Sequence, residues 1–98
     1  MANVVVINLL EVPEGMGAEA LAAWDANAEF FRTQRGYIGT KLHQSVTPGA
    51  AYPLINVAEW ERAEDFQAAI TSAAFERIAA ANPSPATYHP GTYTVIRT

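Results

Sequence analysis

A nearly continuous apolar segment at residues 4–12, Val-Val-Val-Ile-Asn-Leu-Leu-Glu-Val, constrains the fold more than any other feature. It is rich in β-branched residues and lacks the alternation of a strand with one solvated face, so it predicts a central strand buried on both faces. The segment is too short to span a bilayer and has neither a basic N-terminal region nor a small-residue cleavage site. We therefore expect no membrane segment, no signal peptide and a cytoplasmic protein.

The rest of the chain predicts helices and further strands. Residues 18–35 carry apolar side chains three and four positions apart and predict a helix that ends at Gly36. Residues 63–82 show the same spacing, and Thr71-Ser72 is a candidate start for a second short helix within them. Strands are expected in three further segments, namely residues 37–46, about 54–61 and 91–97.

The order strand, helix, strand, strand, helix, strand consists of two β-α-β halves and is typical of the ferredoxin-like α+β fold. In that fold the antiparallel four-stranded sheet has the strand order 4-1-3-2, so the first and third strands are central neighbours. Both helices cover one face of the sheet. Because residues 4–12 indicate that the other face is also buried, a second copy of the chain is the expected cover.

Size and composition agree with this interpretation. With 98 residues, half of them hydrophobic, and no cysteine, the chain is expected to form one domain over residues 1–98 and to gain stability as a homodimer. A formal net charge of −4 without a basic cluster argues against nucleic acid as a partner. Two histidines far apart and the lack of cysteine predict no metal site and no iron–sulfur cluster.

Two amides interrupt the central strands. Asn8 lies within residues 4–12, and Asn56 lies in an apolar stretch of the third strand. A buried amide without a partner costs about 1 to 3 kcal/mol, so each needs a reason. Strand alternation puts Asn56 and Trp60 on one face, and the two amides and the indole can then line one pocket. Structural amides satisfied within the core, with Trp60 as plain core or interface, are an equally open alternative.

Three segments carry a resemblance to a known family. They are Leu-Ile-Asn-Val-Ala-Glu-Trp-Glu-Arg-Ala-Glu-Asp-Phe-Gln-Ala-Ala at 54–69, Gly-Tyr-Ile-Gly at 36–39 and His-Pro-Gly-Thr-Tyr-Thr-Val-Ile at 89–96. In these three segments the chain resembles the antibiotic biosynthesis monooxygenase family. Members of this family are dimeric α/β barrels, so the resemblance implies that fold and a homodimer.

The resemblance also implies an activity. In the branch that forms quinones without a cofactor, an Asn on the first strand and an Asn-x-x-x-Trp on the third line the pocket, and Asn8, Asn56 and Trp60 stand there. The implied reaction inserts oxygen from O₂ into a small phenolic or polycyclic, anthrone-like aromatic. The heme-degrading branch needs a Trp and a heme-ligating His at positions that fall on Ala69 and Ala79, so heme degradation is not expected.

In this interpretation, the N–H groups of the three catalytic candidates donate hydrogen bonds to a substrate oxyanion. The candidates for substrate binding are Trp24, Phe31, Phe66, Ile70 and His43. An asparagine cannot remove a proton, which leaves water, His43 or the acidity of the substrate itself for that step.

Two other functions are compatible with the sequence. The first is a non-catalytic dimeric module that binds a small aromatic or heme-like ligand and whose Asn8 and Asn56 are satisfied by the backbone. The second is an isomerase or cyclase that works by proton transfer through His43. Activity that does not depend on O₂ would distinguish that enzyme from a monooxygenase.

Overall fold

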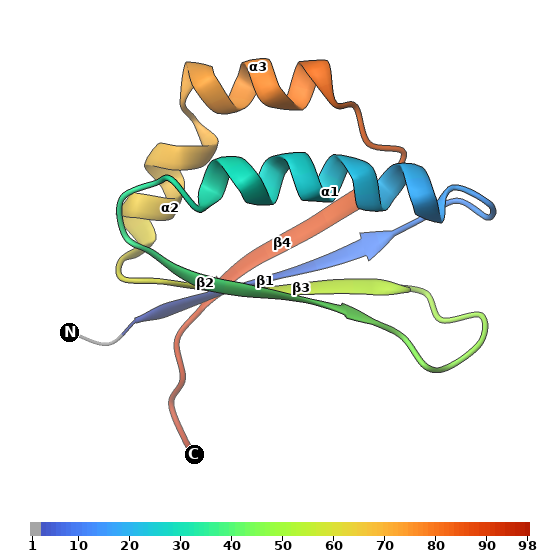
Figure 1. Cartoon of the computed structure of the whole chain (residues 1–98). Coiled ribbons are helices and arrows are strands. Elements are labelled where there is room, and N and C mark those ends of the chain that lie inside the picture. The colour runs from blue at the N-terminus through green and yellow to red at the C-terminus, as the bar shows by residue number, and fades with distance from the viewer. Residues whose placement is uncertain (1–2) are drawn as a thin grey trace.

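The computed structural model describes residues 3–98 and shows an antiparallel sheet with its helices on one side (Figure 1). The elements in chain order are β1 (Val4–Glu11), α1 (Gly17–Phe31), β2 (Tyr37–Gln44), β3 (Leu54–Trp60), α2 (Ala63–Ile70), α3 (Ala73–Ala81) and β4 (Thr87–Tyr93). The strand order is β2-β3-β1-β4. This arrangement confirms the predicted ferredoxin-like α+β fold, with the first and third strands at the centre.

The start of α3 confirms the predicted helix restart. The Ser72 side chain accepts a hydrogen bond from the Phe75 backbone N–H at 3.1 Å, which is the usual role of a serine N-cap. Helix α1, in contrast, ends at Phe31 rather than at residue 35. Its end coincides with Thr33, whose hydroxyl bonds the Phe30 carbonyl at 2.7 Å and favours a turn over further helix.

The predicted bounds of the last strand were wrong. Strand β4 begins at Thr87 and ends at Tyr93, whereas the sequence predicted residues 91–97. The prediction treated His89-Pro90 as the approach to the strand. Because β4 is an edge strand that pairs only with β1, Pro90 can lie within it without breaking a ladder on its free side.

The two faces of the sheet differ in what covers them. On the helix side, Val6 and Leu10 of β1 and Trp60 of β3 are 3%, 0% and 1% exposed. No described element covers the other face, which we call the outer face (Figure 1). Its centre consists of partly exposed apolar side chains, namely Val5, Ile7, Leu9, Ile55 and Val57.

None of the described helices has the length and apolar character needed to cross a membrane.

Gly36 fits the turn between α1 and β2 tightly against α2. Its φ is +82°, and a Cβ atom at this position would lie 2.2 Å from Oδ2 of Asp65. Its carbonyl oxygen accepts a hydrogen bond from the Glu61 backbone N–H at 2.8 Å. Both the left-handed backbone and the close approach require a residue without a side chain.

We expect Gly36→Ala to lower the free energy of unfolding by about 1 to 3 kcal/mol, because alanine is strained at positive φ and also collides with Asp65. Urea denaturation measures the loss. Gly17→Ala is the matched control, because a Cβ atom at Gly17 meets nothing within 4 Å. Equal stability of the two variants would contradict this account of the turn.

Candidate active site

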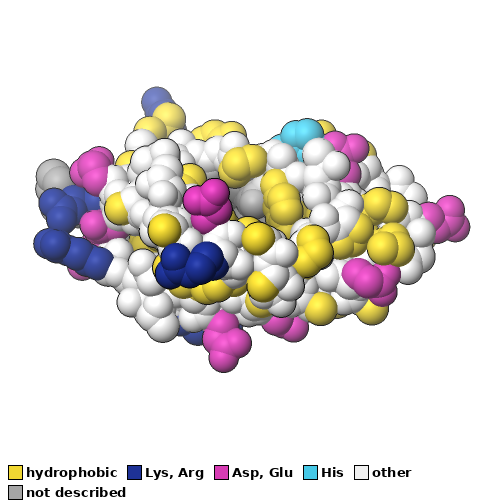
Figure 2. Space-filling view, turned by 90° about the horizontal axis from the view of Figure 1, so that it is seen from above, with side chains coloured by type: hydrophobic (Ala, Val, Ile, Leu, Met, Phe, Trp, Pro, Cys, Tyr) yellow, Lys and Arg dark blue, Asp and Glu magenta, His cyan; other side chains and the backbone are white. Residues whose placement is uncertain are grey.

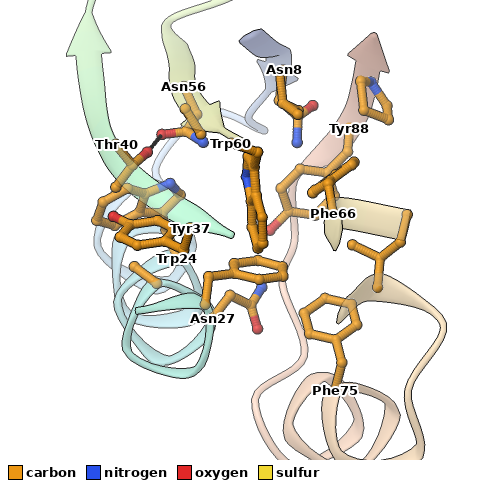
Figure 3. A pocket seen from close by; sticks show the side chains of 16 residues that line it. Asn8, Trp24, Asn27, Tyr37, Thr40, Asn56, Trp60, Phe66, Phe75 and Tyr88 are labelled. Atoms are coloured by element: carbon orange, nitrogen blue, oxygen red, sulfur yellow. Dashed lines mark hydrogen bonds between the residues drawn. The ribbon is translucent and has the colours of Figure 1, made fainter. Parts of the chain in front are cut away.

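A pocket of about 390 Å³ lies between the helix side of the sheet and the three helices (Figure 3). Every strand and helix contributes at least one lining side chain. The lining is mostly aromatic and aliphatic, and no charged residue of the described chain takes part in it. Seen from the helix side, hydrophobic side chains gather over the middle of the molecule and charged ones lie mostly toward its ends and margins (Figure 2). The pocket therefore suits an apolar, uncharged ligand.

Two asparagines form the polar part of the wall that the central strands contribute. Asn8 and Asn56 are direct Cα partners in the pairing of β1 with β3, and both face the pocket (Figure 3). The Thr40 hydroxyl donates a hydrogen bond to Asn56 Oδ1 at 2.6 Å. This bond holds the amide oxygen toward β2 and leaves the NH₂ group of Asn56 available as a donor. Asn8 Oδ1 is buried and has no hydrogen-bond partner within the described residues 3–98.

Trp60 is held by a set of aromatic rings. Its ring meets those of Phe31 and Tyr37 edge to face, with centroid distances of 5.9 and 5.6 Å and interplanar angles of 84° and 85°. Phe66 packs at 5.5 Å and 61°. Edge-to-face pairs at these separations are favourable beyond the burial of their area, so the indole has little freedom to turn.

The structure brings most of the predicted site residues to this pocket. The three catalytic candidates line it together with four of the five substrate-binding candidates, namely Trp24, Phe31, Phe66 and Ile70. His43 does not line it. Because residues that pair directly share a face, His43 lies with its partner Ile55 on the outer face, where its Nδ1 is 3.2 Å from the Ile55 carbonyl oxygen. The position of His43 removes it from proton transfer in the pocket.

The sequence interpretation missed four lining residues with polar groups, which are Asn27, Tyr37, Thr40 and Tyr88. Asn27 is a polar residue on the apolar face of α1, three positions after Trp24, so the reasoning used for Asn8 applied to it as well. Tyr88 was missed because the last strand was placed too late in the chain. Alternation along β2 gave no signal for Thr40, because threonine is common in strands.

The sequence model of the antibiotic biosynthesis monooxygenase family matches residues 3–81. The chain belongs to this family. Membership supports a monooxygenase-type function. No curated protein matches the chain.

Solved structures share the fold over nearly the whole chain. A protein from Shewanella loihica, provisionally named a monooxygenase, is 38% identical, with a TM-score of 0.83 and coverage of 99% of this chain and 97% of that one. The heme-degrader MhuD from Mycobacterium tuberculosis, whose structure holds two hemes in the active site, is 31% identical, with a TM-score of 0.73 and 97% coverage of both chains. SnoaB, a cofactor-independent oxygenase from Streptomyces nogalater, is 24% identical, with a TM-score of 0.83 and coverage of 100% and 97%.

We expect Thr40→Val to free the Asn56 amide, because valine keeps the shape of threonine but cannot donate to Oδ1. The unpaired oxygen should cost about 1 to 3 kcal/mol in the free energy of unfolding. The Asn56 side-chain amide signals in a ¹⁵N–¹H spectrum should also shift or broaden. Thr40→Ser is the matched control, since it keeps the hydroxyl and should keep those signals close to their original positions. Identical amide spectra for the two variants would show that Thr40 does not orient Asn56.

Proposed function

We propose that the protein is a cofactor-independent monooxygenase that inserts an oxygen atom from O₂ into a small phenolic or polycyclic aromatic and gives a quinone. One observation carries the proposal: Asn8 and Asn56 face each other across the central strand pair at the wall of an uncharged aromatic pocket. Trp60 lines the same pocket. Amide and indole N–H groups in an apolar site stabilise a developing oxyanion more strongly than they would in water.

Oxygen insertion into such a substrate needs little from the protein beyond N–H groups that stabilise the substrate anion. O₂ reacts slowly with closed-shell carbon, so the substrate must first become a phenolate-type anion that can give one electron to O₂. The resulting superoxide joins the ring carbon as a peroxide, and its O–O bond then breaks. For an anthrone, the reacting carbon loses both of its hydrogens, one oxygen atom stays on it, and the other leaves as water. The donors of Asn8, Asn56 and Trp60 favour the anion from which this sequence starts.

The first proton has no side-chain base in the described part of the pocket. No His, Asp, Glu or Lys of residues 3–98 lines it. The proton is therefore removed by water or lost through the acidity of the substrate itself. Hydrogen bonds to the anion increase that acidity. This restricts the substrate to aromatics that are already acidic, such as phenols and anthrones.

The described lining of the pocket lacks the commonest heme ligands. It contains no His, Cys or Met, and both histidines belong to the outer face of the sheet, so Tyr37 and Tyr88 are the described lining side chains that could ligate iron. The cavity of about 390 Å³ also lies near the lower end of the range for sites that hold drug-sized molecules. The similarity to MhuD therefore supports a shared fold and family, while the side chains favour a cofactor-free reaction.

The bonding of the two asparagines also favours an enzyme over a passive binding module. A purely structural amide is expected to bond the backbone or another core group. The Thr40 side chain pairs the oxygen of Asn56, but no residue of the described range 3–98 bonds the NH₂ group of Asn56 or Oδ1 of Asn8. These two amides are thus arranged to meet a ligand.

We expect Asn56→Ala and Asn8→Ala each to lower oxygen uptake with an anthrone by about 100-fold, because each removes a donor to the oxyanion. The measurement is oxygen consumption by metal-stripped protein beside a protein-free blank. Asn82→Ala is the matched control, since Asn82 is exposed at the end of α3. Uptake no faster than the blank, or equal uptake in all three variants, would refute the monooxygenase and favour the binding module.

The protein acts, in this proposal, as a homodimer joined through the outer faces of two sheets. An apolar sheet centre without a covering layer is typical of a face that another sheet covers. The C-terminal residues leave β4 on the side away from the helices (Figure 1). They include Val95 and Ile96, which are 62% and 77% exposed, and these side chains extend the apolar surface.

We expect Ile7→Glu to turn the dimer into monomers, because a carboxylate at the centre of the outer face would be buried without a partner. Light scattering after gel filtration measures the mass in solution. Gln67→Glu places the same charge on an exposed position of α2 and should leave the dimer intact. A monomeric unmodified protein, or a dimeric Ile7→Glu variant, would exclude this interface.

A further inference from the structure

Two further unpartnered polar atoms belong to residues that line the pocket and are not catalytic candidates. Asn27 Oδ1 and the Tyr88 hydroxyl are buried and have no hydrogen-bond partner in the described chain. Both residues line the pocket, and neither comes from the central strand pair. Tyr88 reaches in from β4, an edge strand of the sheet, and Asn27 from α1, whereas Asn8 and Asn56 come from the two central strands (Figure 3). The pocket thus has polar groups on more than one side.

The core does not need polar groups at these two positions. Leucine and phenylalanine have nearly the shapes of asparagine and tyrosine and would fill the same space without leaving polar atoms unpaired. The neighbours are apolar: Tyr88 packs against the cluster of Leu10, Ala20 and Leu54. An amide oxygen needs a donor and a phenolic hydroxyl can donate or accept, so a ligand hydroxyl satisfies either group.

The volume of the pocket and the charge of its lining restrict the possible ligands further. An apolar cavity of about 150 Å³ holds one benzene ring, so a cavity of about 390 Å³ has room for two to three fused rings. No cation of the described chain lines the pocket, which disfavours a ligand carboxylate or phosphate. The remaining ligands are neutral, flat aromatics with more than one hydroxyl.

We propose that Asn27 and Tyr88 form a second hydrogen-bonding point, which selects neutral two- to three-ring phenols with an additional hydroxyl away from the strand amides. This selection rests on the proposed function, because it takes the same pocket as the substrate site. Asn8, Asn56 and Trp60 hold the oxygen on which charge develops. Asn27 and Tyr88 bind the distant hydroxyl and fix which ring carbon meets O₂.

Two naphthalenes that differ by one hydroxyl test this assignment. Isothermal titration calorimetry without oxygen measures the affinity for 2-naphthol and for 2,6-dihydroxynaphthalene. We expect the unmodified protein to bind the diol about five- to tenfold more tightly, the effect of one neutral hydrogen bond. In Asn27→Leu and in Tyr88→Phe this preference should fall to no more than about twofold. A twofold preference remains because a symmetrical diol can bind with either of its two equivalent hydroxyls at the strand amides. The affinity for 2-naphthol should not fall in either variant.

Tyr52→Phe is the matched control, because Tyr52 is 38% exposed and its ring packs on His89 outside the pocket. It should keep the full preference for the diol. Urea midpoints separate binding from folding: Asn27→Leu and Tyr88→Phe should equal or exceed the unmodified protein, because each removes an unpaired buried polar group. Lowered midpoints with an unchanged preference would show that the two residues are structural and would overturn the assignment, as would an unmodified protein that does not prefer the diol.

The binding ratio also separates this inference from the proposed reaction. Suppose that the protein consumes no oxygen with an anthrone, and that Asn27→Leu and Tyr88→Phe abolish its preference for the diol. These results would reject the monooxygenase and retain the second hydrogen-bonding point. Oxygen uptake that depends on Asn56 would support the monooxygenase. If Asn27→Leu and Tyr88→Phe then still preferred the diol, the second hydrogen-bonding point would be rejected. A heme Soret band that is lost in Tyr88→Phe would assign Tyr88 as an iron ligand and contradict both.

Discussion

The pairing register of β1 with β3 is the constraint on which the site depends. Asn8 lies opposite Asn56, and Val4 lies opposite Trp60, so one ladder sets the positions of both amides and the indole. Because side chains alternate along a strand, a slip of one residue would move Asn8 to the outer face and break the set. The same register buries Val6 and Leu10 under the helices, so folding of the core and assembly of the polar wall are one event.

A central strand that is apolar on both faces has two consequences in this chain. On the helix side the strands form the wall of a pocket rather than a filled core, because aromatic side chains of α1, α2 and α3 stand around a cavity. On the outer face the apolar side chains have no cover from the described chain. Pocket and uncovered face are thus two sides of a thin sheet, so a change in how one side packs acts on the backbone that positions the other.

The sequence predicted the parts of this structure that depend on periodicity. The element order, the strand order and the shared face of Asn56 and Trp60 follow from alternation and helical spacing, which long segments specify well. The bounds of β4 could not be predicted from these patterns. Proline interrupts strands in most contexts, and Pro90 fits into β4 because β4 is an edge strand with no neighbour on one side. Thr40 could not be identified either. Its hydrogen bond to Asn56 joins residues 16 positions apart and exists only once β2 is in register with β3.

The lack of charge in the pocket limits the chemistry it can support. A localised alkoxide in an apolar site would need a cation or several strong donors, and among residues 3–98 the lining offers neutral N–H and O–H groups only. A phenolate conjugated with two or three rings carries less charge on its oxygen than an alkoxide does, so it needs weaker donors, such as two amides and an indole. The same delocalisation makes the anion a good one-electron donor to O₂. Size, neutrality and reactivity therefore all agree with the proposed kind of substrate: a fused-ring phenol is large enough to fill about 390 Å³, acidic enough to ionise without a side-chain base, and electron-rich enough to react without a cofactor.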